Sequence, residues 1–236
     1  MTRIEVERCP FIILCGGDNT RLESLRGTIY KPFLRLNETT LVAKHAARAV
    51  MAGHGCVDVV IDSSDPLIEA FVTGLSADLK ADVRLSAVPG DARGKVTTVL
   101  SASADVQAAV VVLGDTYSWY DSRQLLSGLH AGDVDCCLAY ARYRLPFGVV
   151  KVEGEAVVGF SEKPQTEYLV NVGAMALDRA ALDLLAQGVA VDDLLTGLAT
   201  AGRVRGVEIS DGFLSIDSLD GVARALSPAG QRLLSG

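Results

Sequence analysis

The sequence has no long apolar run: no stretch reaches the roughly 18–20 residues that a membrane-spanning helix needs. It also lacks a basic excess, because 22 Lys and Arg residues face 29 Asp and Glu residues, which gives a net charge of −7. Nucleic-acid-binding surfaces usually carry the opposite balance. We therefore expect no membrane association and no nucleic-acid partner. A local basic site for a small anion is still compatible with an acidic chain.

The sequence also lacks a Cys-x-x-Cys pair, and its number of cysteines is odd. The five are Cys9, Cys15, Cys56, Cys136 and Cys137. We interpret them as reduced core residues of a cytoplasmic protein. The N-terminus alternates charged residues and contains no signal-peptide core, which agrees with a cytoplasmic location.

Two common glycine-rich nucleotide loops are missing. No Gly-x-Gly-x-x-Gly follows the first apolar run, which disfavours a dinucleotide-dependent dehydrogenase. Segment 90–95 approaches a P-loop, but three residues separate Gly90 from Gly94 where four are needed. Val96 also stands where Ser or Thr would bind Mg²⁺.

Strand and helix patterns alternate through the first 130 residues. The spacing predicts strands over 11–15, 56–61, 83–88 and 109–113, and helices over 39–51, 66–79, 95–106 and 122–129. This order implies a mostly parallel sheet with helices on both faces. Ligands of such sheets bind beyond the carboxyl ends of the strands.

The second half has a different pattern, with short turns between strands. It predicts strands over 135–141, 147–152, 156–160, 168–177, 204–209 and 213–216, and helices over 179–185, 191–201 and 219–226. We expect a single domain, 1–236, with a first half (about 1–130), a second half that contains an inserted mixed-sheet region (about 131–226) and a loosely ordered tail (227–236).

The first strand leads into a loop suited to phosphate. Gly16 and Gly17 let the backbone approach a ligand, and Arg21 and Lys31 add positive charge. Gly114-Asp115 follows another strand in the same way, so the sheet should bring both loops to one edge.

Six segments resemble, in chain order, the motifs of the sugar-1-phosphate nucleotidylyltransferases. They read Gly16-Gly17-Asp18-Asn19-Thr20-Arg21-Leu22 with Tyr30-Lys31-Pro32, Leu113-Gly114-Asp115, Phe147-Gly148-Val149-Val150, Phe160-Ser161-Glu162-Lys163-Pro164, Asn171-Val172-Gly173 and Phe213-Leu214-Ser215-Ile216-Asp217. The resemblance implies a Rossmann-like three-layer α/β/α fold with a mixed, mostly parallel sheet and a small inserted β region for the sugar. It also implies a nucleotidyltransferase enzyme that uses Mg²⁺, with a nucleotide-binding half (about 1–130) and a sugar-binding half (about 131–226).

The resemblance assigns roles to residues of this chain. The nucleotide-binding set is Leu14, Cys15, Gly16, Gly17, Asp18, Asn19, Thr20, Arg21, Lys31, Pro89, Gly94 and Gly114. The catalytic set is Arg21 for pyrophosphate, Lys31 for the α-phosphate, Asp115, and Lys163 for the sugar phosphate. The sugar-phosphate set is Gly148, Glu162, Lys163, Asn171 and Gly173, and the implied metal ligands are Asp115 and Asp217.

The reaction explains these residue types. A sugar 1-phosphate oxygen attacks the α-phosphorus of a nucleoside triphosphate, and pyrophosphate leaves. The attacking group is already anionic, so no general base is required. Such transfers depend on positioning and charge neutralisation, and Mg²⁺ commonly takes one or two carboxylates plus phosphate oxygens.

Several departures leave the substrate open. Asn19 replaces the third glycine of the first motif, Tyr30 replaces a proline, and segment 88–94 lacks the run that reads the base in many members. In its short length the chain resembles the heptose- and mannose-1-phosphate guanylyltransferases and the glucose-1-phosphate thymidylyltransferases, which implies GTP, then dTTP, with a sugar or cyclitol 1-phosphate as the second substrate. The alternatives are a cytidylyltransferase of a phosphorylated alcohol and a non-catalytic nucleotide-sugar-binding regulatory subunit. A homodimer or homo-oligomer is compatible with the sequence.

Overall fold

The computed structural model describes residues 5–16, 30–87, 106–130, 134–145, 147–210 and 212–235. The strands are β1 (Phe11–Leu14), β2 (Val57–Ile61), β3 (Val83–Ala87), β4 (Ala108–Leu113), β5 (Thr116–Ser118), β6 (Cys136–Arg144), β7 (Val149–Glu153), β8 (Ala156–Ser161), β9 (Gln165–Asp178), β10 (Val204–Glu208) and β11 (Phe213–Ser215). The helices are η1 (Val6–Arg8), η3 (Lys31–Phe33), α1 (Leu41–Ala52), α2 (Pro66–Leu79), α4 (Ser122–His130), α5 (Arg179–Ala186), α6 (Val191–Thr200), α7 (Leu219–Leu226) and α8 (Pro228–Ser235).

The main sheet has the strand order β10-β6-β9-β4-β1-β2-β3. Strand β1 pairs in parallel with β2 and β4, β2 with β3, and β6 with β10. Only β9 runs antiparallel to its neighbours, β4 and β6. The expected mixed, mostly parallel sheet is confirmed.

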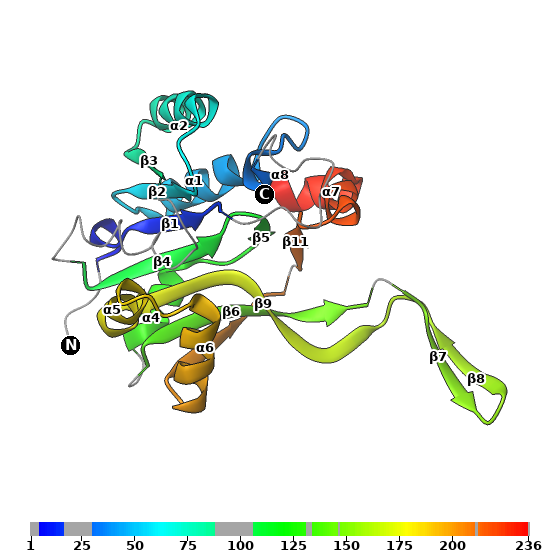
Figure 1. Cartoon of the computed structure of the whole chain (residues 1–236). Helices are drawn as coiled ribbons and strands as arrows, with labels where there is room; N and C mark the ends of the chain where they lie inside the picture. The colour runs from blue at the N-terminus through cyan, green and yellow to red at the C-terminus, as the bar shows by residue number, and fades with distance from the viewer. Residues whose placement is uncertain are drawn as a thin grey trace.

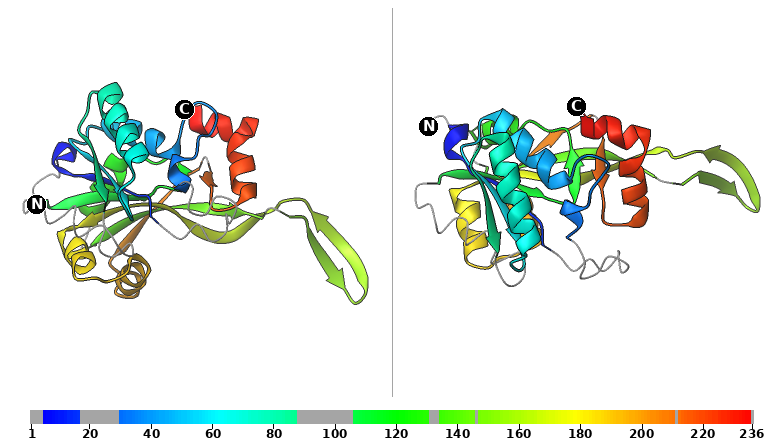
Figure 2. Two further views of the ribbon diagram at one scale, coloured as in Figure 1. Left: turned by 45° about the horizontal axis from the view of Figure 1, so that its top comes forward. Right: turned by 90° about the horizontal axis from the view of Figure 1, so that it is seen from above.

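Helices cover both faces of this sheet (Figures 1 and 2). Along β1, Phe11 and Ile13 pack in the cluster that contains residues of α1, α2 and α4. The alternate residues Ile12 and Leu14 pack in the cluster that contains α5 and α6. Because successive side chains of a strand point to opposite faces, a strand buried on both faces is apolar throughout, as β1 is.

A second, two-stranded sheet joins β5 to β11, which follow β4 and β10 in the chain. Helices α7 and α8 pack beside it and share a third core cluster with Tyr117 and Leu214. Figure 1 places this unit at the end of the molecule to which β1 and β4 point.

The tail does not behave as the sequence suggested: residues 228–235 form helix α8. Ser227 caps it, because the Ser227 Oγ accepts from the Gly230 N–H at 3.2 Å. Pro228 occupies the first turn, where a missing N–H costs nothing. Leu234 is buried at 2% exposure, so an apolar contact holds this helix against the body. The polar composition of the tail had given no sign of the helix.

Strands β7 and β8 form a hairpin that projects from the body in all three ribbon views, and we call it the arm. Val150 pairs with Phe160, and Val152 pairs with Val157, so these four side chains share one face. All four are exposed, by 52–68%. The arm is the inserted β region expected from the sequence, and an apolar face of this kind is unusual on a free surface.

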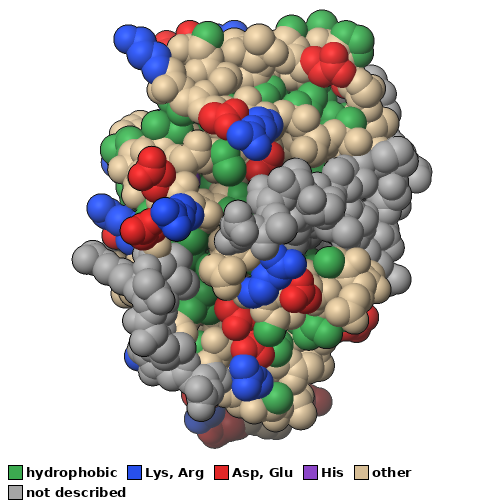
Figure 3. Space-filling model, turned by 90° about the vertical axis from the view of Figure 1, so that its left-hand side faces the viewer, with side chains coloured by type: hydrophobic (Ala, Val, Ile, Leu, Met, Phe, Trp, Pro, Cys, Tyr) green, Lys and Arg blue, Asp and Glu red, His purple; other side chains and the backbone are tan. Residues whose placement is uncertain are grey.

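The other expected elements agree with the described ones to within a few residues, and α2 has the predicted bounds. The helix predicted over 95–106 lies outside the described residues apart from Val106, which precedes β4. All five cysteines are free, and four are buried, as expected of core residues. None of the helices in the described part of the chain combines the length and apolar character needed to cross a bilayer. On the face drawn in Figure 3, acidic and basic side chains of the described residues are interspersed.

Candidate active site

The carboxyl ends of β1 and β4 meet at one edge of the sheet. Leu14 lies opposite Leu113 in the parallel register, and the Gly114 N–H donates to the Leu14 carbonyl at 2.9 Å. The Cys15 N–H in turn donates to the Val60 carbonyl of β2 at 2.8 Å. Gly16 and Gly114 therefore leave adjacent strands at the same edge, as the sequence predicted.

Gly114 is the point where three segments touch. A Cβ atom on Gly114 would lie 2.9 Å from the Cys15 Sγ, 3.0 Å from the Leu14 carbonyl oxygen and 3.0 Å from the Pro32 Cγ. No ordinary side chain fits such a space, so the glycine permits β1, β4 and η3 to pack together. This packing brings the Lys31-Pro32 segment against the Gly114-Asp115 turn.

Lys31 is the first residue of η3 and is half-buried. Its neighbours hold the segment in place: Phe33 is buried and packs edge-on against Phe71 of α2, with ring centroids 5.6 Å apart. The Tyr30 hydroxyl also hydrogen-bonds the Ser63 Oγ at 2.9 Å. Tyr30, which replaces a proline of the family motif, thus ties this segment to the loop after β2.

The segments that carry Asp115 and Asp217 meet through the backbone. The Ile216 N–H donates to the Asp115 carbonyl at 2.9 Å, directly after the β11–β5 pairing of Ser215 with Thr116. Both aspartates are half-buried. Two carboxylates more than 100 residues apart in sequence are therefore delivered to one corner of the sheet edge by this small ribbon.

A cluster around Arg48 of α1 supports that ribbon from behind. Its guanidinium lies 4.4, 4.6 and 4.9 Å from the ring centroids of Tyr117, Trp119 and Tyr120, and donates to the Tyr117 hydroxyl and the Ser118 carbonyl. His45 Nε2 hydrogen-bonds the Thr116 carbonyl at 2.8 Å. Burial, opposed by the Thr116 hydrogen bond and aided by the charge of Arg48, lowers the pKa of His45 to about 3. A neutral His45 that donates from Nε2 thus holds the backbone of Thr116, the residue that follows Asp115, in place.

The donor set at this corner fits a magnesium ion. The described residues contain no group of three or more His, Cys, Asp or Glu side chains suited to a metal. Carboxylates such as those of Asp115 and Asp217 are hard oxygen donors, and Mg²⁺ typically completes such a set with phosphate oxygens and water. The arrangement suits an ion that arrives with a polyphosphate substrate.

The predicted sugar-phosphate residues fall into two groups. Asn171 and Gly173 lie at the sheet edge: the Asn171 Oδ1 accepts from the Gly173 N–H at 2.8 Å, and a Cβ on Gly173 would lie 3.0 Å from the Leu113 Cβ. Gly173 has φ +74°, a conformation that favours glycine. This segment of β9 therefore lies against Leu113, which precedes the Gly114-Asp115 turn.

The second group lies at the base of the arm. Gly148 and Glu162 are neighbours, because a Cβ on Gly148 would lie 3.0 Å from the Glu162 Oε2. Lys163 follows with φ +47°, and Leu145 N–H donates to the Pro164 carbonyl at 3.0 Å across the base. Glu162 and Lys163 are exposed, and the arm points away from the layers that hold Asp115 (Figures 1 and 2). The structure thus brings Gly148 and Glu162 together, but it places them away from the corner that carries Asp115 and Asp217.

Seven predicted nucleotide-binding residues lie outside the described residues. They are Gly17, Asp18, Asn19, Thr20, Arg21, Pro89 and Gly94. Among the described members, Leu14, Cys15 and Gly114 are buried, whereas Gly16 is exposed at the end of β1. Sequence reasoning missed the support by His45 and Arg48. Their helical spacing on 39–51 indicated only a core-facing helix.

Comparisons with known proteins agree with this geometry. A nucleotidyl transferase family model matches residues 11–194. The fold is similar to a crystal structure from Bacillus anthracis, provisionally named a glucose-1-phosphate thymidylyltransferase and solved in complex with a sucrose. The TM-score is 0.71 at 16% sequence identity, and the match covers 94% of this chain and 95% of that one. None of the curated proteins matches the sequence. Because the family model spans most of the sequence, the chain belongs to the nucleotidyl transferase family and is a nucleotidyltransferase enzyme.

Proposed function

We propose that the protein transfers a nucleoside monophosphate from a nucleoside triphosphate to a sugar or cyclitol 1-phosphate, releasing pyrophosphate. The observation that carries this proposal is that four described segments converge at one sheet edge: the end of β1 at Gly16, η3 with Lys31, the Gly114-Asp115 turn after β4 and the segment after β11 that carries Asp217. These features come from distant parts of the chain. Together they suit a polyphosphate and a hard cation better than an uncharged ligand.

Lys31 would hold the α-phosphate, because a point charge fixed against the Gly114-Asp115 turn can neutralise charge that develops there. The carboxylates of Asp115 and Asp217 would hold Mg²⁺, which supplies charge neutralisation between phosphate oxygens when bound. Arg21 is proposed for the leaving pyrophosphate on the basis of the sequence motif alone. Removing one preorganised donor of this kind typically slows the reaction by about 10²–10³-fold.

On the sugar side, we assign Asn171 and the Gly173 backbone to one wall of the pocket and Gly148, Glu162 and Lys163 to the other. For Lys163 to grip a phosphate bound near Asp115, the arm must fold over that corner or come from a second copy of the chain. This requirement favours the homodimer expected as one outcome from the sequence, since the apolar face of the arm would then be covered.

GTP remains our first choice of nucleotide and dTTP the second. The base-reading segment over 88–94 lies outside the described residues, so the preference depends on the sequence resemblance. A cytidylyltransferase of a phosphorylated alcohol is less favoured, because the Phe-x-Glu-Lys-Pro segment over 160–164 is present.

A pyrophosphate-release assay tests the proposal. The purified chain is incubated with Mg²⁺, each common nucleoside triphosphate and a panel of sugar and cyclitol 1-phosphates. We expect release that needs both substrates and stops in excess chelator. Binding of nucleotide sugars without release from any pair would instead support the non-catalytic regulatory alternative.

A further inference from the structure

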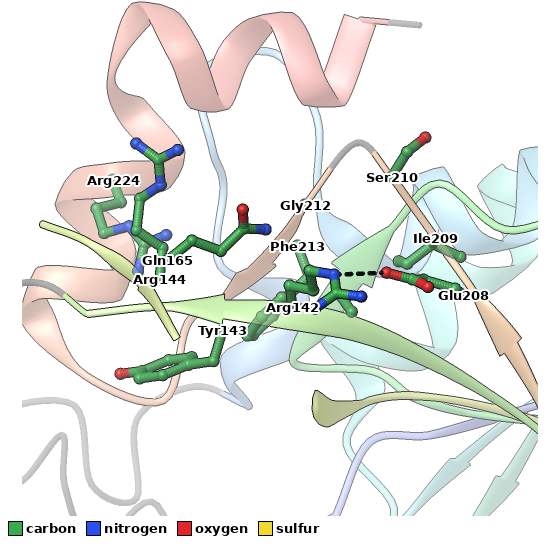
Figure 4. A pocket seen from close by; sticks show the side chains of 11 residues that line it. Arg142, Tyr143, Arg144, Gln165, Glu208, Ile209, Ser210, Gly212, Phe213 and Arg224 are labelled. Carbon is green, nitrogen blue, oxygen red and sulfur yellow. Dashed lines mark hydrogen bonds and ion pairs between the residues drawn. The ribbon is translucent and has the colours of Figure 1, made fainter. Parts of the chain in front are cut away.

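A cavity of about 630 Å³ lies where the ends of β6, β9 and β10 approach β11 and α7. Figure 4 shows Arg144, Arg224 and Gln165 at one end of it and the Arg142–Glu208 pair at the other. None of these residues belongs to the proposed nucleotide or sugar sites. Its volume lies within the range of small-molecule pockets.

The described lining of this cavity is positively charged in an acidic protein. It includes three arginines and one glutamate, whereas the whole chain carries a net charge of −7. Within the described lining, Arg142 is neutralised by an ion pair from its Nε to the Glu208 Oε1 at 3.1 Å. The guanidinium groups of Arg144 and Arg224 have no hydrogen bond or ion pair to any of the described residues.

Like-charged guanidinium groups in one cavity repel each other, and an anion between them relieves this repulsion. Each offers a planar fork of N–H donors that matches phosphate oxygens bidentately. The side-chain amide of Gln165 adds a neutral donor beside them. This donor set is suited to a group that carries two negative charges on several oxygens.

Two apolar side chains also line the cavity. Phe213 is half-buried and Ile209 is buried, and both contribute to the same cavity. An arginine cluster with an apolar floor can hold an organic molecule by its phosphate while covering its uncharged part. Inorganic phosphate alone would leave that floor unused.

We propose that this cavity is a second ligand site, which binds the phosphate or diphosphate group of a small organic metabolite. Phe213 lies in β11, which leads directly to Asp217. A ligand bound here therefore contacts the strand that delivers the second proposed metal ligand. The inference does not rest on the proposed function, because its residues and its charge are independent of the transfer reaction.

Equilibrium dialysis with radiolabelled inorganic pyrophosphate, at low salt and in chelator, tests the site. The double variant Arg144→Gln/Arg224→Gln should bind about one pyrophosphate per chain fewer than the wild type. The control Arg8→Gln/Arg123→Gln removes two exposed arginines elsewhere and should leave the number unchanged. Arg144→Lys/Arg224→Lys should keep the site but weaken it, because the charge remains and the fork is lost.

Unchanged binding by the Arg144→Gln/Arg224→Gln variant would overturn the proposal, provided that its circular dichroism matches the wild type. The Lys31→Gln variant tells the two sites apart. It should lower pyrophosphate binding at the proposed active site and leave binding at the Arg144 and Arg224 site unchanged. If Lys31→Gln has no effect while the double arginine variant loses one site, the second site stands and the nucleotide-binding assignment fails.

Discussion

At the scale of single residues, the proposed magnesium site depends most on the carboxylate of Asp115. We expect Asp115→Asn to lower kcat by at least about 10²-fold, because the amide keeps the shape but loses the charge that neutralises the metal. Pyrophosphate release measures the rate, and thermal unfolding shows that the fold is kept. Asp220→Asn, an exposed aspartate on α7, is the matched control. Wild-type turnover by Asp115→Asn would show that the metal assignment is wrong.

His45 makes stability depend on pH. Its folded-state pKa of about 3 lies below the unfolded value near 6.5, so the unfolded chain binds more protons between these limits. The free energy of unfolding should therefore fall as the pH drops below about 6.5, by about 1.4 kcal/mol at pH 5.5 from His45 alone. Burial also lowers the pKa of His54, which acts in the same direction.

Urea unfolding at pH 7.5 and 5.5 checks this expectation. His45→Gln retains a side-chain N–H donor for the Thr116 carbonyl but cannot titrate. The wild type should lose about 1.4 kcal/mol more than this variant between the two pH values. An equal loss in both proteins would mean that His45 is not the titrating group.

Sequence reasoning identified residues at this scale only where a local pattern marked them. Asp115 stands in a Gly-Asp pair after an apolar strand, and Asp217 ends the last apolar run, so both could be selected from the sequence. Arg48 could not, because its role arises from three aromatic rings that lie about 70 residues away. Such contacts are fixed by tertiary packing and leave no periodic signal.

At the scale of elements, Gly114 joins β1, β4 and η3. Gly114→Ala should force these segments apart and lower both the free energy of unfolding, by about 1–3 kcal/mol, and kcat/KM, because Lys31 moves relative to Asp115. Gly74→Ala is the control. Its Cβ would meet nothing within 4 Å on α2, so this change should stabilise the protein by about 0.5–1 kcal/mol. Unimpaired kcat/KM in Gly114→Ala would contradict the proposed junction.

Helix α8 offers a second test, because it packs beside the single tryptophan of the chain. The Trp119 Nε1–H donates to the Leu233 carbonyl at 2.9 Å, and Leu234 is buried. Leu234→Ala should cost about 2–5 kcal/mol and shift the Trp119 emission to longer wavelength, since the helix then holds the indole less firmly. An unchanged emission maximum and midpoint of unfolding would show that α8 does not dock in solution.

The elements themselves were largely predictable, with one instructive failure. Buried strands such as β1 and β4 have uninterrupted apolar runs, and α2 has both a Pro at its first position and an Asp65 cap, so their bounds follow from local chemistry. Helix α8 has only eight residues, and few of them are large apolar side chains. It is stabilised by the Ser227 cap and one buried leucine, and short helices of this kind depend on tertiary packing.

At the scale of the whole molecule, the arm stands out because its apolar face is uncovered in a single chain. We expect self-association through its apolar face, measured by sedimentation velocity over a range of concentrations. Val150→Thr/Phe160→Thr keeps β-forming residues but removes apolar surface, and should weaken association at least about tenfold. The control Met51→Gln/Leu67→Gln alters two exposed apolar residues elsewhere and should have no effect. A wild-type chain that stays monomeric at all concentrations would contradict this assignment.

The sequence indicated a β insertion here but not its exposure. Strands β7 and β8 are rich in valine, and an apolar strand face is expected to meet a core of its own chain. In the structure the hairpin projects beyond the main sheet, so its apolar face lies on the surface and not against the core of the chain. Whether a strand face is covered depends on where the hairpin is carried in space, and periodicity contains no information on that point.

The hydrogen bond between Ile216 and Asp115 also has a consequence for biosynthesis. Translation proceeds from the N-terminus, so Asp115 leaves the ribosome about a hundred residues before its partner segment. Until β11 emerges and pairs with β5, a nascent chain holds at most one of the two proposed metal-binding carboxylates. Polypeptides released early, before residue 217, would therefore lack one of those carboxylates even if much of their sheet had already formed.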